Sequence, residues 1–164
     1  MHEARIAALQ GMPIFGGLRA EVLAALLDVS RTVEVAQDAF FFHEGDKADA
    51  VYVLERGEVA LLKRWAGEQY VLGRLGTGDC FGEMALLDLH PRSASVQAIE
   101  ACTALALSAT GLYTLYETDV AQFALVQMNI ARELSRRLRV ADERLFRTRV
   151  GALRLEPEPG LPLT

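Results

Sequence analysis

The sequence predicts a mainly β fold, an antiparallel sandwich, barrel or jelly roll with flanking helices. The first observation is a series of about seven short runs, rich in β-branched and aromatic residues, between residues 32 and 108. The second is that Gly and Asp turn residues separate these runs at the spacing typical of antiparallel β domains. The third is a helical apolar period before residue 30 and after residue 110.

Each element is placed by its pattern. Residues 18–29 form the expected N-terminal helix, because apolar residues recur there every three or four positions after the Gly16-Gly17 break. The glycines of GRLGTGDCFG lack the GxGxxG spacing of a dinucleotide loop and are expected in turns and bulges. A short helix is expected at residues 111–117. The expected strands are residues 32–35, 40–43, 50–55, 58–65, 69–75, 95–100 and 103–108.

The C-terminal part predicts one long amphipathic helix. Thr118 or Asp119 is suited to cap it, and it is expected to run to residue 149. Its face opposite the apolar stripe is rich in arginine, and the proline-rich residues 150–164 are expected to form a disordered tail. The chain therefore divides into a domain at 1–118, a helix at 119–149 and the tail. The stripe consists of Phe123, Val126, Ile130, Leu134, Leu138, Ala141 and Leu145.

Length and composition indicate an ordinary globular protein. The chain has 164 residues, the usual size of one domain, and its 51% apolar content suffices for a sizeable core. No apolar stretch is long enough to span a membrane, and the N-terminus lacks the apolar region of a secretion signal, so a cytoplasmic protein is expected. Cys80 and Cys102 lie in apolar surroundings without metal-ligand spacing and are expected to be reduced core residues.

The charge is unevenly distributed. The net charge is −5, with a balance of −8 over residues 1–130 and +4 over residues 131–149. An acidic body of this kind does not resemble a nucleic-acid-binding protein, so no direct nucleic-acid partner is expected. The basic residues 144–149 are interpreted as a solvated helix face.

Motifs for catalysis and metal binding are missing from the sequence. His43-Glu44 is not followed by a second histidine four positions later, and His2 and His90 are isolated from other ligand types. The serines do not form a GxSxG elbow. The sequence therefore predicts neither an enzyme nor a metal site.

The stretch FGEMALLDLHPRSAS, residues 81–95, is the candidate binding site. Gly82 permits a sharp turn into a short helix, whose first backbone N–H groups attract an anion. Arg92 adds a planar donor fork suited to phosphate oxygens, and Ser93 adds a hydroxyl group. Glu83 would repel a phosphate but can accept a hydrogen bond from a sugar hydroxyl. This combination suits a ribose cyclic phosphate, although a surface Glu83–Arg92 ion pair is the alternative that composition alone leaves open.

FGEMALLDLHPRSASV closely resembles the phosphate-binding cassette of cyclic nucleotide-binding domains, whose pattern is roughly F-G-E-apolar-A-L, then P-R-x-A-S/T-V. The flanks, FFFHEGDKADAVYVLERGEVAL and GTGDCFGE, resemble the family's glycine-turned strands, and residues 10–147 fit the family throughout. The resemblance implies a double-stranded β-helix, or jelly-roll, barrel of eight strands with N-terminal helices, a short cassette helix and a long C-terminal helix.

The resemblance also implies roles for single residues. Glu83 would accept a hydrogen bond from the ribose 2′-OH, while Arg92 and Ser93 would bind the cyclic phosphate. Gly82 and the backbone N–H groups of Met84 and Ala85 would complete the cradle. Two further residues, Leu72 and Leu75, are expected to contact the base.

The expected ligand is cAMP or cGMP, without a metal. Family members that prefer cGMP often carry threonine directly after the arginine, whereas bacterial activators with serine there respond to cAMP. Ser93 therefore favours cAMP, and Glu83 argues against ligands without a 2′-hydroxyl partner, such as haem.

The resemblance implies a regulatory switch whose C-terminal helix transmits the signal. We expect a homodimer through this helix and an unknown downstream protein partner. Where the helix reaches the base, Asn129, Glu133, Arg136 or Arg137 is a candidate contact. The alternative function is the effector domain of a Crp/Fnr-like transcriptional regulator that lacks, or is truncated before, its DNA-binding domain.

Overall fold

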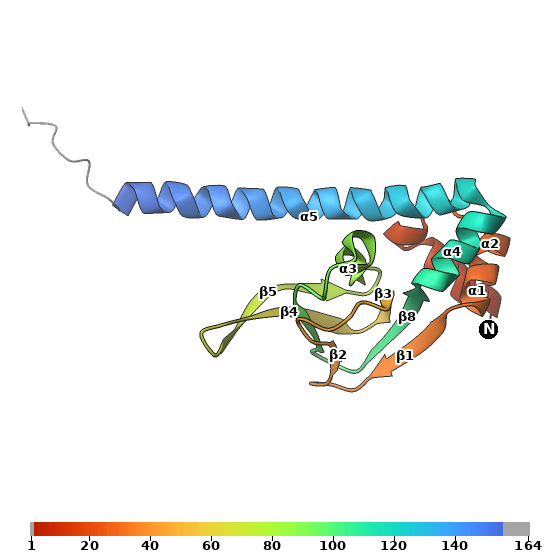
Figure 1. The fold of residues 1–164 in the computed structure, drawn as a ribbon, viewed down its shortest axis with the longest axis horizontal. Helices are drawn as coiled ribbons and strands as arrows, with labels where there is room; N and C mark the ends of the chain where they lie inside the picture. The colour runs from red at the N-terminus through yellow and green to blue at the C-terminus, as the bar shows by residue number, and fades with distance from the viewer. Residues whose placement is uncertain (1, 156–164) are drawn as a thin grey trace, which may run out of the picture. The chain divides into compact units, whose positions relative to one another are not determined.

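The computed structural model describes residues 2–155, with side chains at 3–84 and 87–152. This part of the chain contains eight strands and six helical segments (Figure 1). The helical segments are α1 (His2–Gln10), the 3-10 turn η1 (Pro13–Phe15), α2 (Ala20–Asp28), α3 (Glu83–Asp88), α4 (Ala109–Thr118) and α5 (Val120–Leu155). The strands are β1 (Arg31–Val35), β2 (Phe40–Phe42), β3 (Ala50–Arg56), β4 (Glu58–Trp65), β5 (Glu68–Gly76), β6 (Cys80–Phe81), β7 (Ser95–Ala98) and β8 (Cys102–Ser108).

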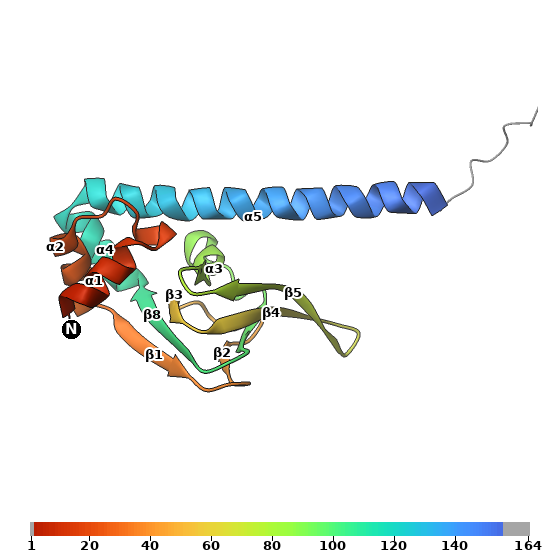
Figure 2. The same ribbon diagram turned by 180° about the vertical axis from the view of Figure 1, so that it is seen from behind.

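The strands form two antiparallel four-stranded sheets. Their orders are β1-β8-β3-β6 and β2-β7-β4-β5, so strands distant in sequence become neighbours, as in a jelly roll. α1, α2 and α4 gather at one end of the sheets in both views, and the β4–β5 hairpin tip lies at the other end (Figures 1 and 2). The mainly β fold with flanking helices is confirmed.

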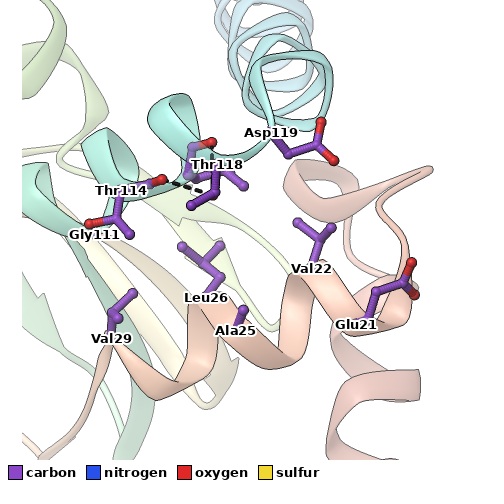
Figure 3. Close-up of a pocket in the computed structure, with 10 residues that line it drawn as sticks. Glu21, Val22, Ala25, Leu26, Val29, Gly111, Thr114, Thr118 and Asp119 are labelled. Carbon is purple, nitrogen blue, oxygen red and sulfur yellow. Dashed lines mark hydrogen bonds between the residues drawn. The ribbon is translucent and has the colours of Figure 1, made fainter.

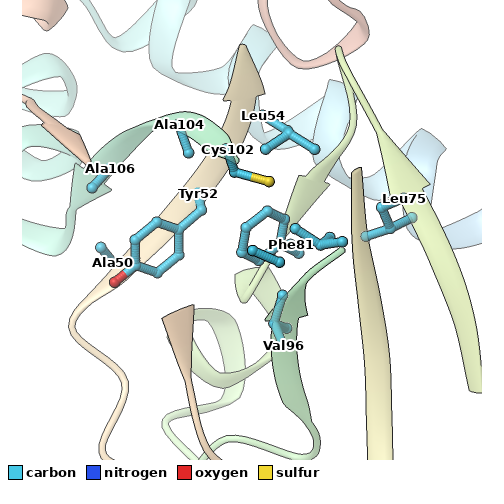
Figure 4. Packing of buried hydrophobic residues seen from close by; sticks show 11 residues of the cluster. Ala50, Tyr52, Leu54, Leu75, Phe81, Val96, Cys102, Ala104 and Ala106 are labelled. Atoms are coloured by element: carbon cyan, nitrogen blue, oxygen red, sulfur yellow. The ribbon is translucent and has the colours of Figure 1, made fainter. Parts of the chain in front are cut away.

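The core lies between the two sheets and is built around aromatic rings (Figure 4). The rings of Tyr52 on β3 and Phe81 on β6 stack with centroids 5.4 Å apart and planes within 12° of parallel. Both cysteines are buried and free, so the prediction of reduced core cysteines is confirmed. Burial raises the pKa of the Cys102 thiol, which keeps it in the unreactive neutral form.

Strand β2 contains a bulge that matters for the site. Phe40 is paired with Gln97 and Phe42 with Val96, so the register shifts between them. A bulge changes the direction in which side chains point. As a result, two consecutive residues, Phe41 and Phe42, both pack against the core, whereas a regular strand would turn one of them outward.

Two buried polar side chains of α5 hold the N-terminal segment. Asn129 Nδ2 donates to the carbonyl oxygens of Ile14 at 3.0 Å and Gly16 at 2.9 Å. Gln122 lies two turns earlier on the same face of α5, and its Oε1 accepts from the backbone N–H of Arg19 at 2.9 Å. These amides satisfy main-chain groups that belong to no sheet, which is why burying them is favourable.

The predicted strands are confirmed with small shifts at their ends, most clearly at 95–100, where β7 ends at Ala98. Three elements were not placed by their pattern: the helix α1, the 3-10 turn η1 and the two-residue strand β6. The N-terminal helix is shorter than the predicted 18–29, because α2 begins at Ala20 and ends at Asp28.

Helix α5 begins after Asp119, whose Oδ1 accepts from the backbone N–H of Gln122 at 3.1 Å. This bond lowers the pKa of Asp119 and identifies it as the cap. The other candidate, Thr118, donates to the carbonyl of Thr114 within α4. The predicted end at residue 149 is wrong, because the helix continues to Leu155. The remainder of the predicted tail lies outside the described residues.

By its contacts the chain forms two units, residues 1–130 and residues 131 onward. The first eleven residues of α5 belong to the first unit, where Val126 and Ile130 are buried. This unit therefore ends later than the predicted boundary at residue 118. In the second unit the same apolar stripe is exposed, with Leu138 62% and Leu145 52% accessible.

Candidate functional site

The candidate site is built around the start of helix α3. Gly82 precedes the helix with φ 80°, the left-handed conformation that glycine adopts without strain. A second requirement also excludes a side chain here, because a Cβ at this position would lie 2.5 Å from Nη1 of Arg92. Glycine is therefore needed at position 82 for two reasons: the left-handed turn of the chain and the close approach of the Arg92 guanidinium.

The side chain of Arg92 is almost completely buried, with 1% exposed. Its Nη1 donates to the Gly82 carbonyl at 2.8 Å, and Nη2 donates to the Ala50 carbonyl at 2.8 Å. Nη2 also lies 3.2 Å from Oδ1 of Asp49, a carboxylate that is mostly exposed. Arg92 thus connects the start of α3 with the start of β3.

One face of the guanidinium lies on aromatic rings. Its central carbon is 4.1 Å from the ring centroid of Phe42 and 5.8 Å from that of Tyr52. The third nitrogen, Nε of Arg92, has no hydrogen-bond partner among the described residues although it is buried. A buried donor of this kind costs free energy unless it finds an acceptor, so this edge of the guanidinium is suited to an anion.

The backbone of Arg92 is also fixed. Its N–H donates to the Asp46 carbonyl at 2.8 Å, and its carbonyl accepts from the Gly45 N–H at 2.8 Å. This pair of bonds anchors Arg92 to the turn between β2 and β3. The turn is closed by Asp46, whose carboxylate accepts from the His43 N–H at 2.8 Å.

Glu83 is the first residue of α3 and is only 3% exposed. Among the charged residues that the structure describes, Glu83 and Arg92 are the two that are buried. Charged groups are rarely buried in a small domain without a function or a partner. A buried acceptor and a buried donor therefore lie at the two positions that the sequence predicted for sugar and phosphate.

The other predicted site residues differ in their surroundings. Met84 is 51% exposed, and the side chain of Ala85 lies outside the description, although its backbone is in the first turn of α3. Ser93 is exposed, and Lys63 Nζ donates to its carbonyl at 2.9 Å. Ser93 directly follows Arg92 along the chain, whereas Met84 and Ala85 directly follow Glu83.

The two leucines expected to contact the base lie in different environments. Leu75 is 9% exposed and belongs to the core cluster between the sheets (Figure 4). Leu72 is 50% exposed and sits where the β4–β5 register shifts. Their contact with a base stays a prediction.

The candidates on helix α5 have other contacts in this structure. Asn129 holds the N-terminal segment, as described above. Glu133 accepts from Arg136 Nε at 3.1 Å and from Arg137 Nε at 2.9 Å, and the two arginines lower its pKa. A contact between these side chains and a base stays a prediction.

Sequence reasoning missed two residues of the site, Phe42 and Asp49. Both touch Arg92 from more than 40 positions away, and no local spacing marks such contacts. The one available signal was the acidic turn EGDKAD directly before a strongly apolar strand.

A separate cavity of about 250 Å³ lies between α2 and α4 (Figure 3). Val22, Leu26 and Val29 line it, and its rim carries the Glu21 and Asp119 carboxylates. Both acids pair with Arg19. The hydroxyls of Thr114 and Thr118 in the lining donate to carbonyls of α4, so the cavity is mainly an apolar depression, and Arg92 is not part of its lining.

Across residues 2–155, no helix has the length and apolar character needed to cross a membrane. The same residues contain no group of three or more His, Cys, Asp or Glu side chains that could hold a metal ion.

Residues 32–119, slightly more than half of the chain, match the family model described as the cyclic nucleotide-binding domain. The chain belongs to this family. The matched residues run from β1 to Asp119 and include the whole cassette with Glu83 and Arg92. The family resemblance of the sequence is therefore confirmed.

Two curated relatives show the range of proteins that contain such domains. The domain is 36% identical over 135 residues to the "Cyclic AMP receptor protein" of Thermus thermophilus, covering 82% of this chain and 61% of the relative. It is 36% identical over 92 residues to a "cAMP-dependent protein kinase regulatory subunit" of Emericella nidulans, covering 56% of this chain and 22% of the relative. The chain thus spans less than two thirds of either protein.

A solved structure agrees with the fold. The "Catabolite Activator Protein" of Thermus thermophilus matches with a TM-score of 0.70 at 36% identity, covering 81% of this chain and 61% of that chain. The jelly-roll fold with flanking helices that the resemblance implied is confirmed.

Proposed function

We propose that the domain binds a 3′,5′-cyclic nucleotide, with cAMP preferred, between the start of α3 and Arg92. The observation that carries the proposal is the buried guanidinium of Arg92, whose Nε has no partner among the described residues. A phosphate oxygen at this edge would satisfy the donor and balance the buried charge. The backbone N–H groups of Met84 and Ala85, in the first turn of α3, would add donors to the same anion.

The buried carboxylate of Glu83 supports a ribose beside the phosphate. A 2′-hydroxyl would donate to this carboxylate, and a cyclic phosphate holds the sugar and the charge close together. Glu83 directly follows Gly82, whose carbonyl accepts from Arg92 Nη1 at 2.8 Å. Both relatives named above carry cAMP in their descriptions, and Ser93 directly follows the arginine, which favours the same ligand.

Isothermal titration with cAMP and cGMP tests the proposal. We expect saturable binding of one ligand per chain, with the higher affinity for cAMP. At 100 times Kd the ligand should stabilise the fold by about 2.7 kcal/mol, which a thermal-shift measurement detects. A chain that neither binds nor gains stability with either nucleotide would contradict the proposed function.

Replacing Glu83 with Gln should weaken cAMP binding by about 10- to 100-fold, because a charge-assisted hydrogen bond becomes a neutral one at a buried position. The measurement is a double-mutant cycle in which the second change is made in the ligand, by comparing cAMP with 2′-deoxy-cAMP. Glu83→Gln should have little further effect on 2′-deoxy-cAMP. Equal losses with both ligands would place the role of Glu83 away from the sugar.

We further propose that α5 relays ligand binding and forms a homodimer through residues 131–155. The exposed apolar stripe supports this, since Leu138 and Leu145 are more than half exposed and helices in proteins gain most of their stability by packing an amphipathic face. Ion pairs such as Arg147–Glu143, at 2.8 Å, support the helix itself but do not cover the stripe. A second copy of the same stripe would do so in a coiled-coil arrangement.

Sedimentation velocity should therefore show a dimer, and the double variant Leu138→Glu, Leu145→Glu should be monomeric. Val140→Glu is the matched control, because Val140 is 44% exposed on the same helix but lies off the stripe. A monomeric wild-type chain, with or without cAMP, would rule out the proposed dimer and leave the ligand proposal intact.

A further inference from the structure

Beyond the predicted cassette residues, the structure contains an aromatic support under the phosphate-binding arginine. The support is the ring of Phe42, whose centroid lies 4.1 Å from the central carbon of the Arg92 guanidinium. A guanidinium at this distance over a ring is attracted by the negative face of the π system. The attraction is stronger when both groups are removed from water, and the Arg92 side chain is 1% exposed.

We propose that Phe42 positions Arg92 for the phosphate and thereby sets the affinity for the cyclic nucleotide; this rests on the proposed function. The reason is geometric. Carbonyl groups fix Nη1 and Nη2, and the ring fixes the plane of the guanidinium. Nε is the guanidinium nitrogen left without a partner among the described residues, so the direction of its N–H is set before the ligand arrives. Such preorganisation avoids the cost of ordering a long side chain during binding.

The bulge in β2 explains how Phe42 reaches this place. Without the register shift between Phe40 and Phe42, alternation would direct neighbouring residues to opposite faces. With the shift, Phe42 contacts both the core rings and the guanidinium, with its centroid 5.8 Å from that of Tyr52. The core rings therefore hold the Phe42 ring in contact with Arg92.

Phe41 offers a matched control. It lies on the same strand, is partly buried like Phe42, and also contacts the rings of Tyr52 at 5.5 Å and Phe81 at 5.0 Å. The guanidinium lies over Phe42 and Tyr52, so the contact with Arg92 distinguishes the two phenylalanines. Leucine at position 41 or 42 removes similar ring packing, and at position 42 it removes the cation–π contact as well.

The test compares Phe42→Leu, Phe42→Tyr and Phe41→Leu by titration with cAMP. We expect Phe42→Leu to raise Kd by about 5- to 20-fold, while Phe42→Tyr, which keeps a ring, and Phe41→Leu stay within about twofold of wild type. Equal losses in Phe42→Leu and Phe41→Leu would overturn the proposal, since both would then reflect packing alone.

A ligand-free measurement separates this proposal from the proposed function. The NMR signal of the Arg92 Nε proton should be shifted upfield by the ring in wild type, in Phe42→Tyr and in Phe41→Leu. It should move downfield in Phe42→Leu, because the nearest ring is removed while Tyr52 remains, and an unchanged signal would refute the positioning role. If the wild-type chain binds neither cAMP nor cGMP, the proposed function fails, whereas this signal still decides whether Phe42 positions Arg92. Should Phe42→Leu not fold, the wild-type and Phe42→Tyr signals decide alone, and an unshifted wild-type signal overturns the proposal.

Discussion

Replacing Arg92 with alanine is expected to weaken cAMP binding by at least about 30-fold. Truncating one partner of a buried, hydrogen-bonded charge pair typically costs about 2–5 kcal/mol, which corresponds to roughly 30- to 4000-fold in Kd. Arg92→Lys should lose most of the affinity as well. A lysine carries the charge but lacks the planar fork that reaches two carbonyls and a phosphate at once. Isothermal titration measures both losses.

Arg92→Ala should also lower the stability of the ligand-free domain. The Gly82 and Ala50 carbonyls would lose their donors inside the protein, at a cost of about 1–3 kcal/mol each. Chemical denaturation without nucleotide measures this loss. Arg74→Ala is the control, because Arg74 is 64% exposed and pairs with the exposed Glu58 at 3.1 Å. An Arg92→Ala variant that binds as tightly as wild type would contradict the assigned phosphate site.

Replacing Gly82 with alanine should be the most damaging change of a single methyl group. The φ of 80° strains any side chain, and the new Cβ would lie 2.5 Å from Arg92 Nη1, a contact that forces the guanidinium to move. We expect a loss of about 2–4 kcal/mol in unfolding free energy, from backbone strain of about 1–2 kcal/mol plus a disrupted buried hydrogen bond. Nucleotide affinity should fall with it.

Gly67→Ala isolates the contribution of the strain. Gly67, in the β4–β5 turn, has φ 83°, and a Cβ there would meet nothing within 4 Å. The difference between the two variants in chemical denaturation therefore measures the clash with Arg92. If Gly82→Ala were no worse than Gly67→Ala, the close approach of Gly82 to Arg92 would not matter for stability.

The elements predicted from the sequence were those with a strong period. Strand β4 at residues 58–65 has the predicted bounds, because a short apolar run lies there between two turns, RG and AGE. Strand β6, Cys80–Phe81, spans two residues and cannot show a period at all. Helix α1 has only Ile6 and Leu9 buried, too few for an apolar stripe, so its pattern was not distinctive.

The residues of the site likewise fall into those that local spacing predicts and those that it does not. Glu83, Arg92 and the turn at Gly82 were predictable because they lie within one short stretch with a specific spacing. Phe42 and Asp49 reach Arg92 only after the strands have paired, through a bulge and a turn whose geometry the sequence does not encode locally. The end of α5 was predicted too early. The proline-rich composition of residues 150–164 suggested a tail from residue 150, but the first of these prolines is Pro157, and the helix continues to Leu155.

The hydrogen bonds of Gln122 and Asn129 to the N-terminal segment give the domain an internal reporter of the docking of α5. The Arg19 amide hydrogen is bonded to the side chain of Gln122, a residue 103 positions further along the chain, and not to a strand or helix of its own. Its exchange with deuterium in water therefore reports whether the start of α5 is docked. An amide inside a helix is protected from exchange by its hydrogen bond within that helix, whereas the Arg19 amide is protected by its bond to Gln122. The exchange rate of one amide proton near the N-terminus thus shows whether the first turn of α5 is docked.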